Sequence, residues 1–64
     1  MTLKEITFYT NQLSALYVED NKDLREQTVG FLNKVFNHVS YAVDGEEGIE
    51  MYQQREYDIV ITDI

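Results

Sequence analysis

The chain has 64 residues, a formal net charge of −7, a hydrophobic fraction of 44% and no cysteine. This composition predicts a folded chain, and the lack of cysteine excludes a disulfide framework and thiol chemistry. The acidic balance argues against nucleic-acid binding through this segment, which needs a basic patch. No apolar run approaches the ~18 residues of a membrane span and no signal peptide is evident, so we expect a cytoplasmic protein without a membrane partner.

Residues 1–12 form an N-terminal leader ahead of the first strong pattern. Thr2 and Glu5 have the spacing of a capping box, which favours a short helix here, with a frayed terminus as the alternative. The mostly apolar run 13–18 then predicts the first strand, and the domain proper is expected to cover residues 13–64.

A helix is predicted after this strand, capped by Asp20 or Asn21. Gly30 lies off its apolar face, and the helix should end near Phe36 with Asn37 as a left-handed C-cap. The apolar positions recur with helical spacing and predict one stripe, formed by Leu24, Thr28, Phe31, Leu32 and Val35.

The second strand is predicted from alternation between residues 39 and 43. Val39, Tyr41 and Val43 alternate with Ser40 and Ala42, which is typical of a half-buried strand at a sheet edge. The dipeptide that follows, Asp44-Gly45, is by itself a hairpin signal.

Residues 46–55 decide against a hairpin, because they are good helix formers with acids in the first turn. Ile49 and Tyr52, together with Gly48, are expected to face one way. The acids of this helix are expected on a solvated face: Glu46, Glu47 and Glu50.

The last strand is predicted from Tyr57 to Asp63. Its residues 59–62 are all β-branched and apolar on both alternating faces, apart from the methyl-bearing Thr62. Such a run is typical of a parallel strand that is covered on both sides.

Strands and helices therefore alternate, which predicts an α/β fold with a parallel sheet. Right-handed crossovers allow the strand order 2-1-3 with the two helices on opposite faces. The carboxyl ends of the first and third strands then bring Glu19, Asp20 and Asp63 together, and three close carboxylates favour a bound cation such as Mg²⁺. The alternative is that these acids only cap helices or face solvent.

Three segments carry a family resemblance: Leu-Tyr-Val-Glu-Asp-Asn at 16–21, Ala-Val-Asp-Gly-Glu-Glu-Gly at 42–48, and Tyr-Asp-Ile-Val-Ile-Thr-Asp-Ile at 57–64. In this order and spacing they resemble the N-terminal half of a response-regulator receiver domain in two-component signalling. The resemblance implies a flavodoxin-like, doubly wound parallel sheet. It also implies a phosphoacceptor that takes a phosphoryl group from a histidine kinase or phosphotransfer protein, and not an enzyme with a separate substrate.

By this resemblance Asp63 is the phosphoacceptor, Asp20 is a direct Mg²⁺ ligand, and Glu19 acts on the metal through water. Receiver domains are longer than this chain. The backbone carbonyl that binds Mg²⁺ two residues beyond Asp63, and the Ser/Thr and Lys that bind the phosphoryl group, are not in the sequence. Phosphotransfer is therefore expected of the complete domain, with weak or absent Mg²⁺ binding in this fragment.

Two further hypotheses come from other classes of function. The strand 57–62 would be an edge in the order 2-1-3, so the chain is expected to form homo-oligomers, and a self-associating half-domain is the alternative function. A carboxylate-based hydrolase is a remote third hypothesis. His38, the single histidine, is predicted to be a surface residue at the end of the sheet opposite Asp63.

Overall fold

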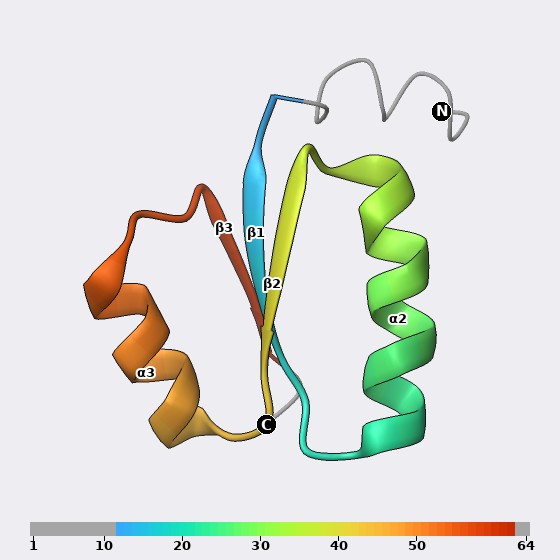
Figure 1. The fold of residues 1–64 in the computed structure, drawn as a ribbon, viewed down its shortest axis with the longest axis horizontal. Helices are drawn as coiled ribbons and strands as arrows, with labels where there is room; N and C mark the ends of the chain where they lie inside the picture. Colours follow the sequence, from blue (N-terminus) through green and yellow to red (C-terminus); the bar gives the residue numbers. More distant parts are fainter. Residues whose placement is uncertain (1–11, 63–64) are drawn as a thin grey trace.

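The computed structural model describes residues 12–62 and has an α/β fold (Figure 1). Its elements are β1 (Ser14–Val18), α2 (Lys22–Val35), β2 (His38–Ala42), α3 (Gly45–Gln54) and β3 (Ile59–Thr62). The strands are parallel in the order β2-β1-β3, which confirms the predicted topology. The helix predicted in the leader falls on residues 1–11 and lies outside the described residues, as does Asp63.

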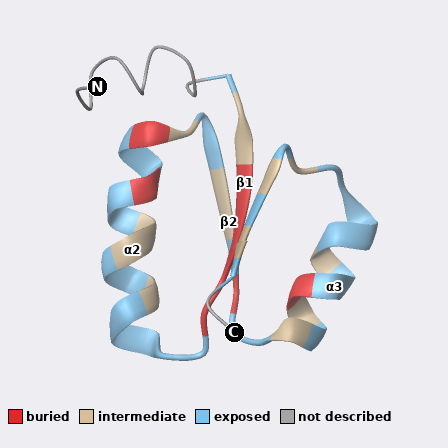
Figure 2. Ribbon diagram, turned by 180° about the vertical axis from the view of Figure 1, so that it is seen from behind, coloured by how far each residue is buried: buried red, intermediate tan, exposed pale blue. Residues whose placement is uncertain are grey.

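The helices cover opposite faces of the sheet, as Figure 1 shows. The core is concentrated on the central strand, where Ala15, Leu16, Tyr17 and Val18 are all buried (Figure 2). Burial of successive residues follows because β1 has a strand on each side and a helix over each face. None of the helices in the described part of the chain is long and apolar enough to cross a membrane.

Asp58 fastens β3 to the start of β1. Its Oδ2 accepts hydrogen bonds from the backbone N–H and the hydroxyl of Ser14, at 2.8 and 3.2 Å. The Asp58 N–H donates to the Ser14 carbonyl at 3.1 Å. These bonds lie where the ladder begins, and they agree with the register that pairs Ala15 with Ile59 and Val18 with Thr62.

Helix α2 begins and ends within a residue of its predicted bounds. Asn21 is the N-cap, and its Oδ1 accepts from the Leu24 N–H at 2.9 Å. The predicted apolar stripe is only partly correct, because Leu32 and Val35 are buried whereas Leu24 and Phe31 are exposed. The extensive contacts of α2 with the other described elements are with β2, so only part of the stripe is covered.

The left-handed C-cap predicted at Asn37 is wrong. None of the described non-glycine residues has a positive φ, and the C-cap is Phe36, whose backbone is extended. Strand β2 begins at His38, so the chain passes directly from the helix into extended structure. The Asn37 N–H then donates to the Leu13 carbonyl at 3.0 Å and ties this corner to the start of β1.

Strand β2 is an edge strand among those described, as predicted, but the expected burial is partly reversed. Ala42 is fully buried, Val39 is half-buried, Tyr41 is 51% exposed, and Val43 is exposed. The reason is a close approach of α3 to the Ala42 face, where a Cβ on Gly48 would lie 3.8 Å from the Ala42 Cβ. The alternation of the strand was correct, but the better-covered face is the one that carries the small residue.

The prediction that β3 is covered on both sides is also wrong for the described residues. Ile59 and Ile61 are half-buried, whereas Val60 is 46% exposed and Thr62 is exposed. Strand β3 lies at the outer edge of the sheet, and the extensive contacts of α3 are with β1 and β2. Neither described helix therefore covers the Val60 side of β3 closely.

Candidate functional site

The candidate site lies at the carboxyl end of the sheet, where β1 and β3 end together. The parallel register pairs Val18 with Thr62, and these residues immediately precede Glu19 and Asp63 in the sequence. In open α/β sheets, ligands bind at this end of the strands. Asp63 lies outside the described residues, so its role as phosphoacceptor and metal ligand stays a prediction.

Glu19 is the most unusual residue at this end of the sheet. It is a carboxylate residue with only 6% of its surface exposed. Its Oε2 accepts from the Asn21 N–H at 3.1 Å, and its own N–H donates to the Ala42 carbonyl at 3.1 Å. Its Oε1 is buried and has no hydrogen-bond partner among the described residues. A buried carboxylate oxygen without a partner is costly, so Oε1 is a candidate ligand atom.

Asp20 follows Glu19 and is exposed. The turn therefore presents one buried and one accessible carboxylate at the same strand end. Within residues 12–62, no three His, Cys, Asp or Glu side chains are grouped closely enough to hold a metal ion. Glu19 and Asp20 supply two of the three predicted metal residues, and the third, Asp63, lies outside this range.

The donors at this turn fit Mg²⁺, since carboxylate oxygens are the hard ligands that this ion prefers. The orphaned Glu19 Oε1 is the specific observation behind this fit. Glu19 and Asp20 would hold the ion from this chain.

Arg25 is a residue of this site that the sequence analysis missed. Its Nη1 donates to the Glu19 carbonyl at 2.9 Å, and its guanidinium lies over the Tyr41 ring, 5.7 Å from the centroid. A signal was available in the sequence. With Asn21 as N-cap, Arg25 stands in the first turn of α2, and long helix side chains lean back toward the N-terminus.

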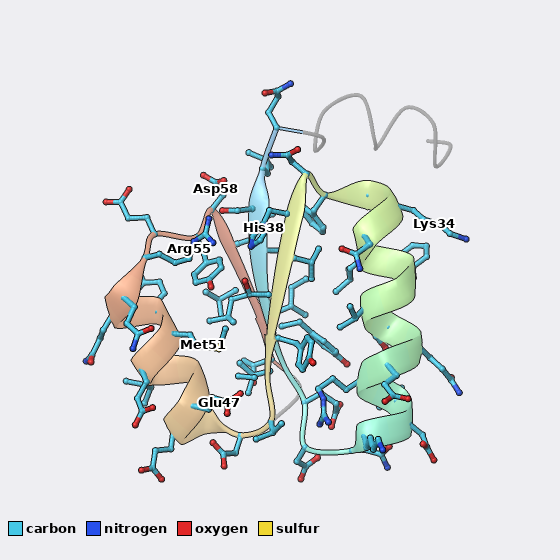
Figure 3. The ribbon with its side chains drawn as sticks, viewed as in Figure 1. Lys34, His38, Glu47, Met51, Arg55 and Asp58 are labelled. Carbon is cyan, nitrogen blue, oxygen red and sulfur yellow. The ribbon has the colours of Figure 1, made fainter. Side chains whose placement is uncertain are left out.

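His38 lies at the other end of the sheet, as predicted. It is the exposed first residue of β2, near Arg55 and Asp58 (Figure 3). Its Nε2 lies 3.1 Å from the Ser40 hydroxyl and 3.2 Å from Arg55 Nη1. This arrangement is separated from Glu19 by the length of β2 and takes no part in the candidate site.

An apolar groove of about 310 Å³ lies between α3 and β3. Among the described residues, its lining has no polar side chain apart from Thr62 and the Tyr52 hydroxyl, and it has no charged one. The described part of the groove is therefore an apolar packing surface. Its lining residues are Leu16, Val18, Gly45, Gly48, Ile49, Tyr52, Val60 and Thr62.

The chain is similar to a protein of Bacillus subtilis (strain 168) named uncharacterized transcriptional regulatory protein YcbL. The two are 41% identical over 49 residues, which cover 77% of this chain and 22% of that protein. The chain thus spans less than a quarter of the length of this relative. No protein-family model matches the chain. No solved structure matches it either.

Proposed function

We propose that this chain is part of a receiver domain that accepts a phosphoryl group on Asp63 from a histidine kinase or phosphotransfer protein. The observation that carries the proposal is the buried, unpartnered Oε1 of Glu19 at the strand end where β1 and β3 stop in register. The similarity to a transcriptional regulatory protein supports a regulatory role. The metal residues in this proposal are Asp20, Asp63 and, through water, Glu19.

The proposed step is a phosphoryl transfer between two side chains. A carboxylate oxygen of Asp63 attacks phosphorus, a P–O bond forms, and the P–N bond to the donor histidine breaks. The leaving imidazole nitrogen keeps the electron pair and takes up a proton. Glu19 and Asp20 would contribute by holding a divalent cation, which would offset the negative charge of the phosphoryl group.

The test is acyl-phosphate formation with phosphoramidate, a donor that carries the same P–N bond. It is performed with Mg²⁺ on the 64-residue chain and on the longest protein that its gene encodes. We expect labelling of the longest protein, loss of the label in Asp63→Asn, and retention in Asp58→Asn, an exposed acid that precedes the same strand. A label that persists in Asp63→Asn, or an unlabelled wild-type protein, contradicts the proposal.

Self-association is a second candidate, favoured by the outer strand. No described strand lies beyond β3, and its four residues carry no Lys or Pro to block pairing. Two copies related by a two-fold axis could pair β3 with β3 antiparallel and join their sheets. Packing α3 against a second sheet is disfavoured, because it would bury the exposed polar side chains Glu46, Glu50 and Gln53.

Light scattering at several concentrations tests this association. Val60→Lys adds a charge to the outer strand and should weaken it. Val43→Lys is the matched control, because it adds the same charge at an exposed position beside the opposite edge strand. Both variants reduce the net negative charge equally, so a difference in their association reports on pairing at the outer strand. A wild-type chain that stays monomeric at all concentrations contradicts this candidate.

A further inference from the structure

Arg25 joins three elements at the candidate site. It belongs to α2, donates to the carbonyl of Glu19 just beyond β1, and lies over Tyr41 of β2. It is half-buried, so both contacts are partly shielded from water. A guanidinium is suited to this position because its planar face can lie over an aromatic ring while its N–H groups donate hydrogen bonds in the plane of the guanidinium.

The bond to the Glu19 carbonyl controls more than one residue. That oxygen and the Asp20 N–H belong to one planar peptide group, so holding the oxygen fixes the orientation of the whole plane. This peptide group links Glu19 to Asp20, so its orientation affects the direction of both side chains. Two other polar groups of Glu19 are also hydrogen-bonded. Its N–H donates to the Ala42 carbonyl, and its Oε2 accepts from the Asn21 N–H.

We propose that Arg25, braced by Tyr41, is a positioning residue that sets the orientation of the Glu19–Asp20 peptide and thereby the two carboxylates toward a divalent cation. This inference rests on the proposed function, because it assumes that Glu19 and Asp20 serve a metal. Supporting groups around metal ligands typically change metal affinity by about 10–100-fold when they are removed.

A purely electrostatic role and a positioning role for Arg25 predict opposite changes in cation affinity when Arg25 is replaced. A positive guanidinium near two carboxylates repels a cation, so if only its charge mattered, removing it would tighten cation binding. If Arg25 positions the turn, removing it weakens binding despite the lost repulsion. Arg25→Met removes the charge and the donor but keeps a long side chain. Arg25→Lys keeps the charge and loses the planar group.

The chain offers a matched control at the other end of the sheet. Arg55 lies over the Tyr57 ring, 5.5 Å from its centroid, in the same kind of arrangement. Arg55→Met therefore removes one positive charge and one guanidinium–tyrosine contact far from Glu19. Tyr41→Phe and Tyr41→Leu complete the set, because the first keeps an aromatic face for Arg25 and the second does not.

The experiment is titration of the ¹⁵N-labelled longest protein that the gene encodes with Mn²⁺, whose paramagnetic broadening of amide signals reports even weak binding. In the wild type we expect broadening at Glu19 and Asp20, competed by Mg²⁺ and abolished by Asp20→Ala. Arg25→Met and Arg25→Lys should each lower the affinity about tenfold, the lower end for such supporting contacts. Tyr41→Leu should lower it by a smaller factor, with Tyr41→Phe and Arg55→Met unchanged.

The outcomes separate the two proposals. No broadening near Glu19 and Asp20 in the wild type would overturn the metal site itself and, with it, the role of Arg25. Wild-type binding that is unchanged or tighter in Arg25→Met would overturn only the positioning role. If Arg25→Met does not fold, Arg25→Lys decides, and an affinity equal to that of the wild type is the overturning result.

Discussion

The two helices attach to the sheet in different ways. Helix α2 buries side chains, with Leu32 and Val35 both enclosed. Helix α3 has one buried residue, Gly48, which has no side chain to bury. A Cβ at this position would lie only 2.9 Å from Val18 Cγ2, so the backbone of α3 already rests against the β1 side chain. One helix is held by interdigitated side chains, and the other by a close backbone approach.

This difference explains where the open surface of the α3 face lies. The close approach at Gly48 places α3 over β1 and β2. The half-buried Met51 and Tyr57 pack against the buried cluster of Leu16, Val18 and Ala42. Ile49 and Tyr52 remain exposed and form one wall of the apolar groove beside β3. An attachment through so few buried atoms predicts that α3 is the less stable helix.

The largest expected effect compares one apolar side chain from each helix. Leu32→Ala should destabilise the fold by about 2–4 kcal/mol, because Leu32 is 7% exposed and its truncation leaves a cavity. Ile49→Ala should cost less than about 0.5 kcal/mol, because Ile49 is 62% exposed. Urea unfolding followed by circular dichroism at a fixed chain concentration measures both. Equal losses would show that α3 is held by side chains as α2 is.

The next effect compares the two helix glycines, whose Ala variants should change stability with opposite sign. Gly48→Ala forces a Cβ against stiff, buried Val18, and overpacking of about 1–3 kcal/mol outweighs the gain of about 1 kcal/mol in helix propensity. Gly30→Ala meets nothing within 4 Å, so it should stabilise α2 by about 0.5–1 kcal/mol.

The same unfolding experiment checks this pair. A Gly48→Ala variant that is as stable as the wild type would mean that Val18 yields easily and that the close approach is not what holds α3. Gly30→Ala serves as its internal control, since both substitutions are chemically identical and both lie inside a helix.

The elements, their order and the sheet topology were predictable because they depend on local pattern. Hydrophobic periodicity and a cap residue located α2, helix formers with acids in the first turn located α3, and the acids after two strands located the candidate site. Burial was less predictable. Tyr41 is a larger hydrophobe than Ala42, yet Ala42 is the buried one, because burial depends on how closely a helix approaches and not on the strand's own alternation.

The site was predictable only as far as its strand-end acids. The first-turn position of Arg25 indicates that its side chain leans toward Glu19, but nothing along the chain indicates its contact with Tyr41 of β2. The role of Glu47 was missed for a different reason. Asp44 and Glu47 have the capping-box spacing, and Glu47 Oε1 accepts from the Val43 N–H at 3.2 Å, so this acid is not merely solvated.

A third prediction concerns the two N-caps. Asn21 accepts from the Leu24 N–H, and Asp44 accepts from the Glu47 N–H at 2.8 Å, so each replacement by Ala should cost about 1 kcal/mol. The distribution of the effect should differ. Amide hydrogen exchange should rise throughout α3 in Asp44→Ala, because few buried side chains hold that helix, but only in the first turn of α2 in Asn21→Ala. Similar exchange profiles would contradict the difference between the helices.

The smallest effect concerns the strand that α3 leaves uncovered. With Val60 exposed, β3 depends on its ladder with β1 and on the bonds between Asp58 and Ser14 at the start of that ladder. Asp58→Asn keeps the shape of the side chain but removes the charge that strengthens these exposed bonds, so we expect a loss of about 0.5–1 kcal/mol. Glu56→Gln removes the same charge from an exposed neighbour and should leave stability unchanged. The effect should appear as faster amide exchange in β3 with little change in α2. If amide exchange in β3 is the same in both variants, the backbone ladder alone holds the strand, and the Asp58–Ser14 hydrogen bonds do not stabilise it.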